Sequence, residues 1–118
     1  MHSAIESLQG QPFFVRRWGD PALPRLLLLH GFPEYGGAWA ETASHLSQHF
    51  HCIAPDQRGY GQSWAPEGVE NYAASSLIGD MVALIGAEQG PVTVFGHDWG
   101  AAIAYGLAMF HPHLVDRL

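Results

Sequence analysis

Short apolar runs alternate with longer amphipathic segments along this chain. The runs at 25–31 and 51–56 are almost continuously apolar, which is typical of strands buried on both faces of a sheet. The run at 92–97 begins with three β-branched residues, and the segment 12–18 is rich in aromatic and β-branched side chains. The pattern therefore predicts strands at these four places.

Three longer segments place apolar residues at helical spacing, and we expect helices at 36–49, at about 72–88 and at 99–110. Strands that alternate with helices are typical of β-α-β units, which form parallel sheets. The sequence thus predicts an α/β fold: a mostly parallel sheet of about five strands with flanking helices, three of them main helices.

Composition narrows the classes of function. The chain has 118 residues, enough for one domain, and its formal net charge of −6 disfavours nucleic acid as a partner. The N-terminus has no secretory pattern, and no apolar run reaches the roughly 18 residues of a membrane span, so we expect a cytoplasmic protein. Cys52 is the single cysteine and lies in an apolar run, where a core thiol is expected.

Three chemically suggestive stretches each follow a predicted buried strand. They are HGFPE at 30–34, DQRGYGQS at 56–63 and GHDWGA at 96–101. Because the carboxyl ends of parallel strands meet at one edge of a sheet, we expect the three stretches to lie together, at the edge where α/β sheets bind ligands.

The stretch GHDWG has the spacing of a nucleophile elbow, a sharp strand-to-helix turn, with Asp98 where serine usually stands. Two interpretations of Asp98 remain open from this stretch alone. It is either the nucleophile or an N-cap of the following helix, since aspartate is favoured at that position. On a nucleophile elbow, Asp98 should take φ and ψ values unusual for a residue other than glycine.

In this order, the three motifs resemble the α/β-hydrolase fold and, within it, the epoxide hydrolases that use an aspartate nucleophile. The resemblance runs from Pro12 onward. It implies that Asp98 attacks a small apolar epoxide to form an ester, which water hydrolyses to a diol without a cofactor. It also implies roles for the neighbouring residues: an oxyanion hole from the backbone N–H groups of Phe32 and Trp99, loop support from His30, Gly31 and a cis Pro33, and elbow geometry from Gly96, His97 and Gly100.

Other residues in these motifs receive plainer roles. We expect Asp56 and Arg58 to tie down their loop as an ion pair, and Trp99, and with it Phe32, to line a substrate pocket. His45 and His49 are four residues apart on a predicted helix, but two ligands do not make a zinc site, so no metal is expected.

A haloalkane dehalogenase is the alternative within the aspartate hydrolases. Such enzymes stabilise a departing halide, commonly with a side-chain donor from the residue after His-Gly. Here that residue is Phe32, which has no side-chain donor. Epoxide hydrolysis is therefore the preferred interpretation.

The sequence stops at HPHLVDRL, where the resemblance implies that another strand should begin. We therefore expect residues 1–118 to form a single partial domain, the N-terminal part of the fold, truncated before the strand that follows the helix at 99–110. The lid tyrosines, the histidine and the acid of the family would be absent, leaving this chain inactive alone. Self-association through an exposed sheet edge is expected, and a non-catalytic module that pairs through that edge remains the alternative.

Overall fold

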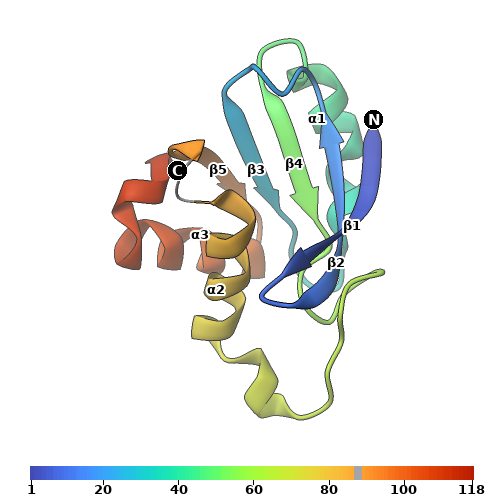
Figure 1. The fold of residues 1–118 in the computed structure, drawn as a ribbon, viewed down its shortest axis with the longest axis vertical. Helices are drawn as coiled ribbons and strands as arrows, with labels where there is room; N and C mark the ends of the chain where they lie inside the picture. The colour runs from blue at the N-terminus through green and yellow to red at the C-terminus, as the bar shows by residue number, and fades with distance from the viewer. Residues whose placement is uncertain (87–88) are drawn as a thin grey trace.

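A single mixed sheet with helices on both faces organises the molecule (Figure 1). The computed structural model describes residues 1–86 and 89–118. The strands are β1 His2–Leu8, β2 Gln11–Trp18, β3 Arg25–Leu29, β4 His51–Pro55, β5 Val92–Gly96 and β6 Val115–Arg117. The main helices are α1 Ala40–Leu46, α2 Ala74–Ile85 and α3 Trp99–Phe110, with short 3-10 turns at Gly36–Trp39, Val69–Tyr72 and Pro112–Leu114.

The strand order is β1-β2-β4-β3-β5-β6. The neighbouring pairs β3/β4, β3/β5 and β5/β6 are parallel, whereas β1/β2 and β2/β4 are antiparallel. The carboxyl ends of β3, β4 and β5 consequently meet at one edge of the sheet. The three motifs begin there, as the sequence predicted.

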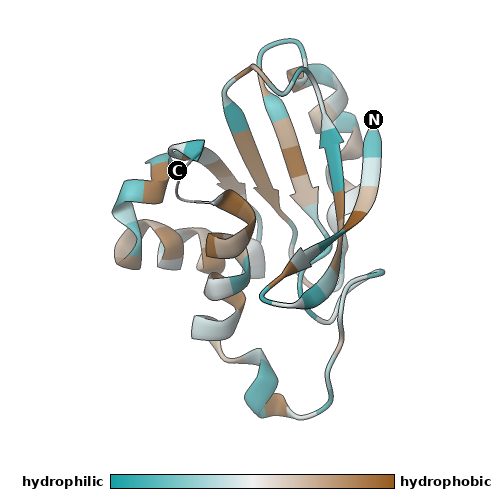
Figure 2. Ribbon diagram, in the orientation of Figure 1, coloured by the Kyte–Doolittle hydropathy of each residue, from teal (hydrophilic) through white to brown (hydrophobic). Residues whose placement is uncertain are grey.

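Both faces of β3 are buried, which explains its continuous apolar run (Figure 2). Alternate residues point to opposite faces of a strand, so Leu27 and Leu29 join the core under α2 and α3. Leu26 and Leu28 join the second core with Ala43 of α1. Cys52 lies in this second core, where burial raises the pKa of its thiol.

Two of the three helical segments are shorter than the sequence predicted. The segment predicted at 36–49 begins as a 3-10 turn and becomes α-helical only over Ala40–Leu46. Helix α2 ends at Ile85 because Gly86 takes a positive φ of 68°, and the predicted extension over 87–88 lies outside the described residues. Helix α3 has the predicted bounds.

Two strands went unpredicted. Strand β1 pairs with β2 along its whole length, but its mainly exposed residues give no apolar pattern. Strand β6 follows α3, where the sequence analysis expected the chain to end before any further strand. It pairs only with Val92 and Thr93 of β5, so the outer edge of β5 is partly paired rather than fully open. No helix in the described part of the chain is long and apolar enough to cross a membrane.

Candidate active site

Asp98 occupies a sharp turn between β5 and α3. Its backbone has φ 58° and ψ −122°, and Gln9 is the one other non-glycine residue with positive φ among the described residues. Residues that carry a Cβ atom rarely adopt such backbone angles, because Cβ crowds the backbone. The strand thus passes directly into the helix, as the glycine spacing predicted. The turn presents the Asp98 side chain at the exposed carboxyl edge of the sheet.

Close backbone packing holds this turn against the end of β3. A Cβ added at Gly100 would lie 2.1 Å from the carbonyl oxygen of Leu29, and one added at Gly31 would lie 2.5 Å from Cβ of Asp98. The N–H of His97 also donates to the Leu29 carbonyl at 3.1 Å. The elbow and the HGFPE loop therefore contact each other directly, and only glycine fits at the two points of closest approach.

The Asp98 carboxylate receives backbone N–H groups. The N–H of Phe32 donates to Oδ2 at 3.1 Å. This bond, followed by the N–H of Trp99 at the start of α3, holds the pKa of Asp98 below its usual value. Asp98 is therefore ionised at neutral pH. The Phe32–Pro33 peptide that follows is cis, as the resemblance implied.

His30 is buried at the end of β3, and both of its ring nitrogens are hydrogen-bonded. The N–H of Gln57 donates to Nε2 at 3.0 Å, so the ring proton lies on Nδ1, 3.0 Å from the carbonyl oxygen of Gly31. Burial lowers the pKa of His30 from its ordinary value. The neutral ring thus braces the loop and has no free nitrogen with which to accept a proton.

The low pKa of His30 predicts a loss of stability in mild acid. Above about pH 6.5 the ring is neutral in the folded and the unfolded chain; below it the unfolded chain takes up the proton first. The free energy of unfolding should then fall by up to about 1.4 kcal/mol per pH unit for this one proton. Urea titrations between pH 5 and 8 measure this slope, which should shrink in His30→Asn but persist when the exposed His49 is replaced by asparagine. Equal slopes in all three proteins would contradict the assignment.

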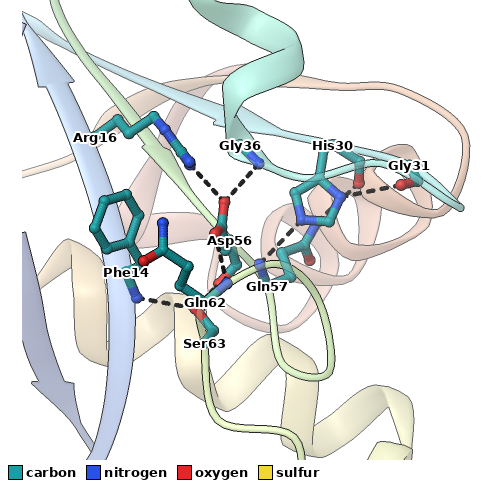
Figure 3. Close-up of polar contacts among 9 residues, drawn as sticks. All are labelled: Phe14, Arg16, His30, Gly31, Gly36, Asp56, Gln57, Gln62 and Ser63. Atoms are coloured by element: carbon teal, nitrogen blue, oxygen red, sulfur yellow. Dashed lines mark hydrogen bonds and ion pairs between the residues drawn. The ribbon is translucent and has the colours of Figure 1, made fainter. Parts of the chain in front are cut away.

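The expected ion pair between Asp56 and Arg58 is wrong, because the two side chains point to different partners. Asp56 accepts from Arg16 at 2.6 Å and from the N–H groups of Gly36 and Gln62 (Figure 3). Arg58 instead forms an ion pair with Asp80 of α2. Each side chain still fixes the loop, but Asp56 anchors it to β2 and Arg58 anchors it to α2.

A cavity of about 290 Å³ opens beside the elbow. Its lining includes Trp99, as the sequence predicted, and Gln57 and Tyr60 of the DQRGYGQS stretch, which the sequence analysis did not single out. Phe32 is not part of this lining. The full lining comprises His30, Gly31, Gln57, Arg58, Tyr60, Tyr72, Leu77, Trp99 and Ile103.

Tyr60 connects the cavity to the elbow. Its ring packs edge-on against His30 at 5.0 Å and against Phe32 at 6.5 Å between centroids. Burial, and then the negative charge of Asp98, raise the pKa of Tyr60, so its hydroxyl stays protonated. The position of Tyr60 shortly after the end of β4 was the one signal in the sequence that could have indicated its place beside the elbow.

His97 precedes Asp98, but its ring points to the HGFPE loop. Its Nδ1 lies 3.4 Å from Oε1 of Glu34, which also accepts the N–H of Gly31. His97 therefore contributes to the contact between the two loops. In the part of the chain described, no three histidine, cysteine or acidic residues gather in a way that could hold a metal ion.

Comparisons with known proteins all point to one family. A family model described as alpha/beta hydrolase fold matches residues 24–118. The chain is 40% identical over 101 residues to epoxide hydrolase A of Mycobacterium tuberculosis, covering 82% of this chain and 31% of that protein. It is 39% identical over 94 residues to epoxide hydrolase 2 of Caenorhabditis elegans, covering 79% of this chain and 26% of that protein.

Solved structures agree with these sequence relatives. An epoxide hydrolase from Vigna radiata superposes with a TM-score of 0.91 at 36% identity, covering 97% of this chain and 37% of that one. Epoxide hydrolase A from Mycobacterium thermoresistibile superposes with a TM-score of 0.92 at 33% identity, covering 97% and 36%. The chain thus spans between about a quarter and two fifths of the length of the proteins that it resembles.

Proposed function

Because this chain belongs to the alpha/beta hydrolase fold family, we propose that it supplies the nucleophile and the oxyanion hole of an epoxide hydrolase. The observation that carries the proposal is the hydrogen bond of 3.1 Å from the Phe32 N–H to Asp98, whose carboxylate stands on a strained elbow. The two relatives compared above are named epoxide hydrolases, which supports epoxide as the substrate class.

In the first step, Oδ1 of Asp98 attacks an epoxide carbon. A new carbon–oxygen bond forms, the carbon–oxygen bond of the ring breaks, and the epoxide oxygen leaves as an alkoxide that takes up a proton from solvent water. Oδ2 becomes the carbonyl oxygen of the ester and stays beside the Phe32 N–H. The low pKa of Asp98 keeps the carboxylate ready for this attack at neutral pH.

In the second step, water adds to Cγ of Asp98. The negative charge then develops on Oδ2, where the N–H groups of Phe32 and Trp99 stabilise it, and the bond from Cγ to the alkylated oxygen breaks to release the diol. The base that deprotonates this water is not assigned to any described residue. We therefore propose that residues 1–118 alone do not complete this step.

The destination of the water oxygen in these two steps provides the test of the proposed function. Protein from the complete reading frame, in excess over an aryl epoxide in H₂¹⁸O, should place ¹⁸O in the Asp98 carboxylate and none in the first diol released. Mass spectrometry of the Asp98 peptide and of the diol measures both. Label that appears directly in the diol would mean that water, not Asp98, attacks the epoxide.

The same protein distinguishes the dehalogenase alternative. A primary alkyl bromide of similar size should release no bromide above the background of the Asp98→Asn variant, because the Phe32 side chain offers no donor to a departing halide. Bromide release at a rate comparable to diol formation would favour the dehalogenase.

A further inference from the structure

One peptide unit links His30 to Asp98. The carbonyl of Gly31 accepts from the His30 ring at 3.0 Å, and the N–H of the same peptide, belonging to Phe32, donates to Asp98 at 3.1 Å. In a planar trans peptide the C=O and the N–H point in opposite directions. The Gly31 carbonyl also accepts the N–H of Glu34 at 2.9 Å, so the His30 ring is one of two groups that fix this peptide and thereby aim its N–H at the carboxylate.

Gln57 holds His30 at two points. Its backbone N–H donates to Nε2 of the His30 ring at 3.0 Å, and its side-chain amide donates to the His30 carbonyl at 2.8 Å (Figure 3). The first bond fixes the tautomer that presents Nδ1–H to Gly31, and the second fixes the backbone from which the ring projects. Gln57 and His30 are 6% and 1% exposed, so water does not replace these bonds.

We propose that the Gln57 side chain is a positioning residue for the Asp98 site. It acts through His30 and the Gly31–Phe32 peptide, and it thereby sets the strength of the Phe32 N–H bond to Asp98. The kinetic part of this proposal rests on the proposed function. The electrostatic part does not, because it concerns the charge state of Asp98 alone.

The variant Gln57→Met tests the proposal, because methionine has a similar length but no donor for the His30 carbonyl. The loop should then shift, the Phe32 N–H bond should weaken, and the pKa of Asp98 should rise. Protein from the complete reading frame, with aspartate labelled by ¹³C at Cγ, reports that pKa by NMR titration. The resonance lost in Asp98→Ala identifies the residue.

Hydrolysis of the alkyl-enzyme ester provides the second measurement. After a single turnover with an aryl epoxide, the ester should decay about 10-fold more slowly in Gln57→Met than in the wild type, because an oxyanion donor is displaced. Gln62→Met is the matched control. Gln62 lies in the same loop but its side chain is exposed, so this variant should change neither the pKa of Asp98 nor the decay.

The outcomes separate the two proposals. An Asp98 pKa that rises in Gln57→Met but not in Gln62→Met supports the positioning role even if no epoxide reacts, in which case only the proposed function fails. An unchanged Asp98 pKa and an unchanged ester decay in a folded Gln57→Met protein overturn the positioning role, and leave Gln57 a purely structural residue. Should Gln57→Met not fold, Gln57→Asn answers the same question, because its shorter amide cannot span the 2.8 Å bond.

Discussion

A polypeptide of residues 1–118 should take up one molecule of a reactive aryl epoxide and then stop. We expect a single covalent adduct at Asp98, no adduct in Asp98→Ala, and no steady-state formation of diol. Alkylation and ester hydrolysis are separate steps, and under the function proposed above the described residues would supply a nucleophile for the first step without a base for the second.

The positions of three histidines show why hydrolysis should stall: His30 and His97 lie at the carboxyl edge of the sheet, and His51 lies at the opposite edge. Both ring nitrogens of His30 are hydrogen-bonded, and Nδ1 of His97 lies 3.4 Å from Glu34. His51 contacts the Gly19 carbonyl and Arg17, beside the amino end of β4. A general base contributes about 10²- to 10⁴-fold to such a step, so the ester should persist by a factor of that size.

Intact-mass spectrometry over time measures the adduct, and peptide mapping locates it. Asp98→Asn is a useful second control, because it keeps the size of the side chain but removes the negative charge that the proposed attack requires. Repeated turnover that Asp98→Ala abolishes would contradict the prediction, because the base that activates water would then lie within these 118 residues.

The fold and the place of the site could be predicted because they depend on local patterns. Buried strands such as β3 carry continuous apolar runs, and the glycines at 96 and 100 are required by a turn that leaves no room for Cβ. Parallel strands bring their carboxyl ends to one edge whatever their sequences. These features are sufficient to predict that Asp98, Phe32 and His30 lie together.

The partners of buried polar side chains could not be predicted in the same way. Asp56 and Arg58 are two residues apart and of opposite charge, which suggested that they pair with each other. They follow the end of a strand, where neighbouring side chains diverge, so each finds a partner 40 and 22 residues away in sequence. The role that we propose for Gln57 depends on the same kind of long-range contact. No periodicity or motif in the sequence indicates this contact.

Removing Asp80 should destabilise the protein more than removing any exposed charge. Asp80 accepts two bonds from Arg58, at 2.8 and 3.0 Å, and one from Gln9 at 2.9 Å. The side chains of Asp80 and Arg58 are 1% and 9% exposed. Asp80→Ala leaves the guanidinium of Arg58 buried without its counter-charge, and breaking such a pair costs about 3–5 kcal/mol of unfolding free energy.

The pair between Arg17 and Glu6 offers a matched control in the same chain. Its ion-pair distance is also 2.8 Å, but its side chains are 27% and 30% exposed. Glu6→Ala should therefore cost only about 0–1 kcal/mol, because water solvates the remaining charge. Urea denaturation of both variants measures the difference, and equal costs would show that burial does not decide the strength of these pairs.

In the double variant Arg58→Met and Asp80→Leu no charge is left buried without a partner, so part of the lost unfolding free energy should return. Arg58 and Tyr60 both line the cavity beside Asp98. Asp80→Ala should therefore also loosen the lining of this cavity, so that the free energy of unfolding and the rate of ester formation fall together.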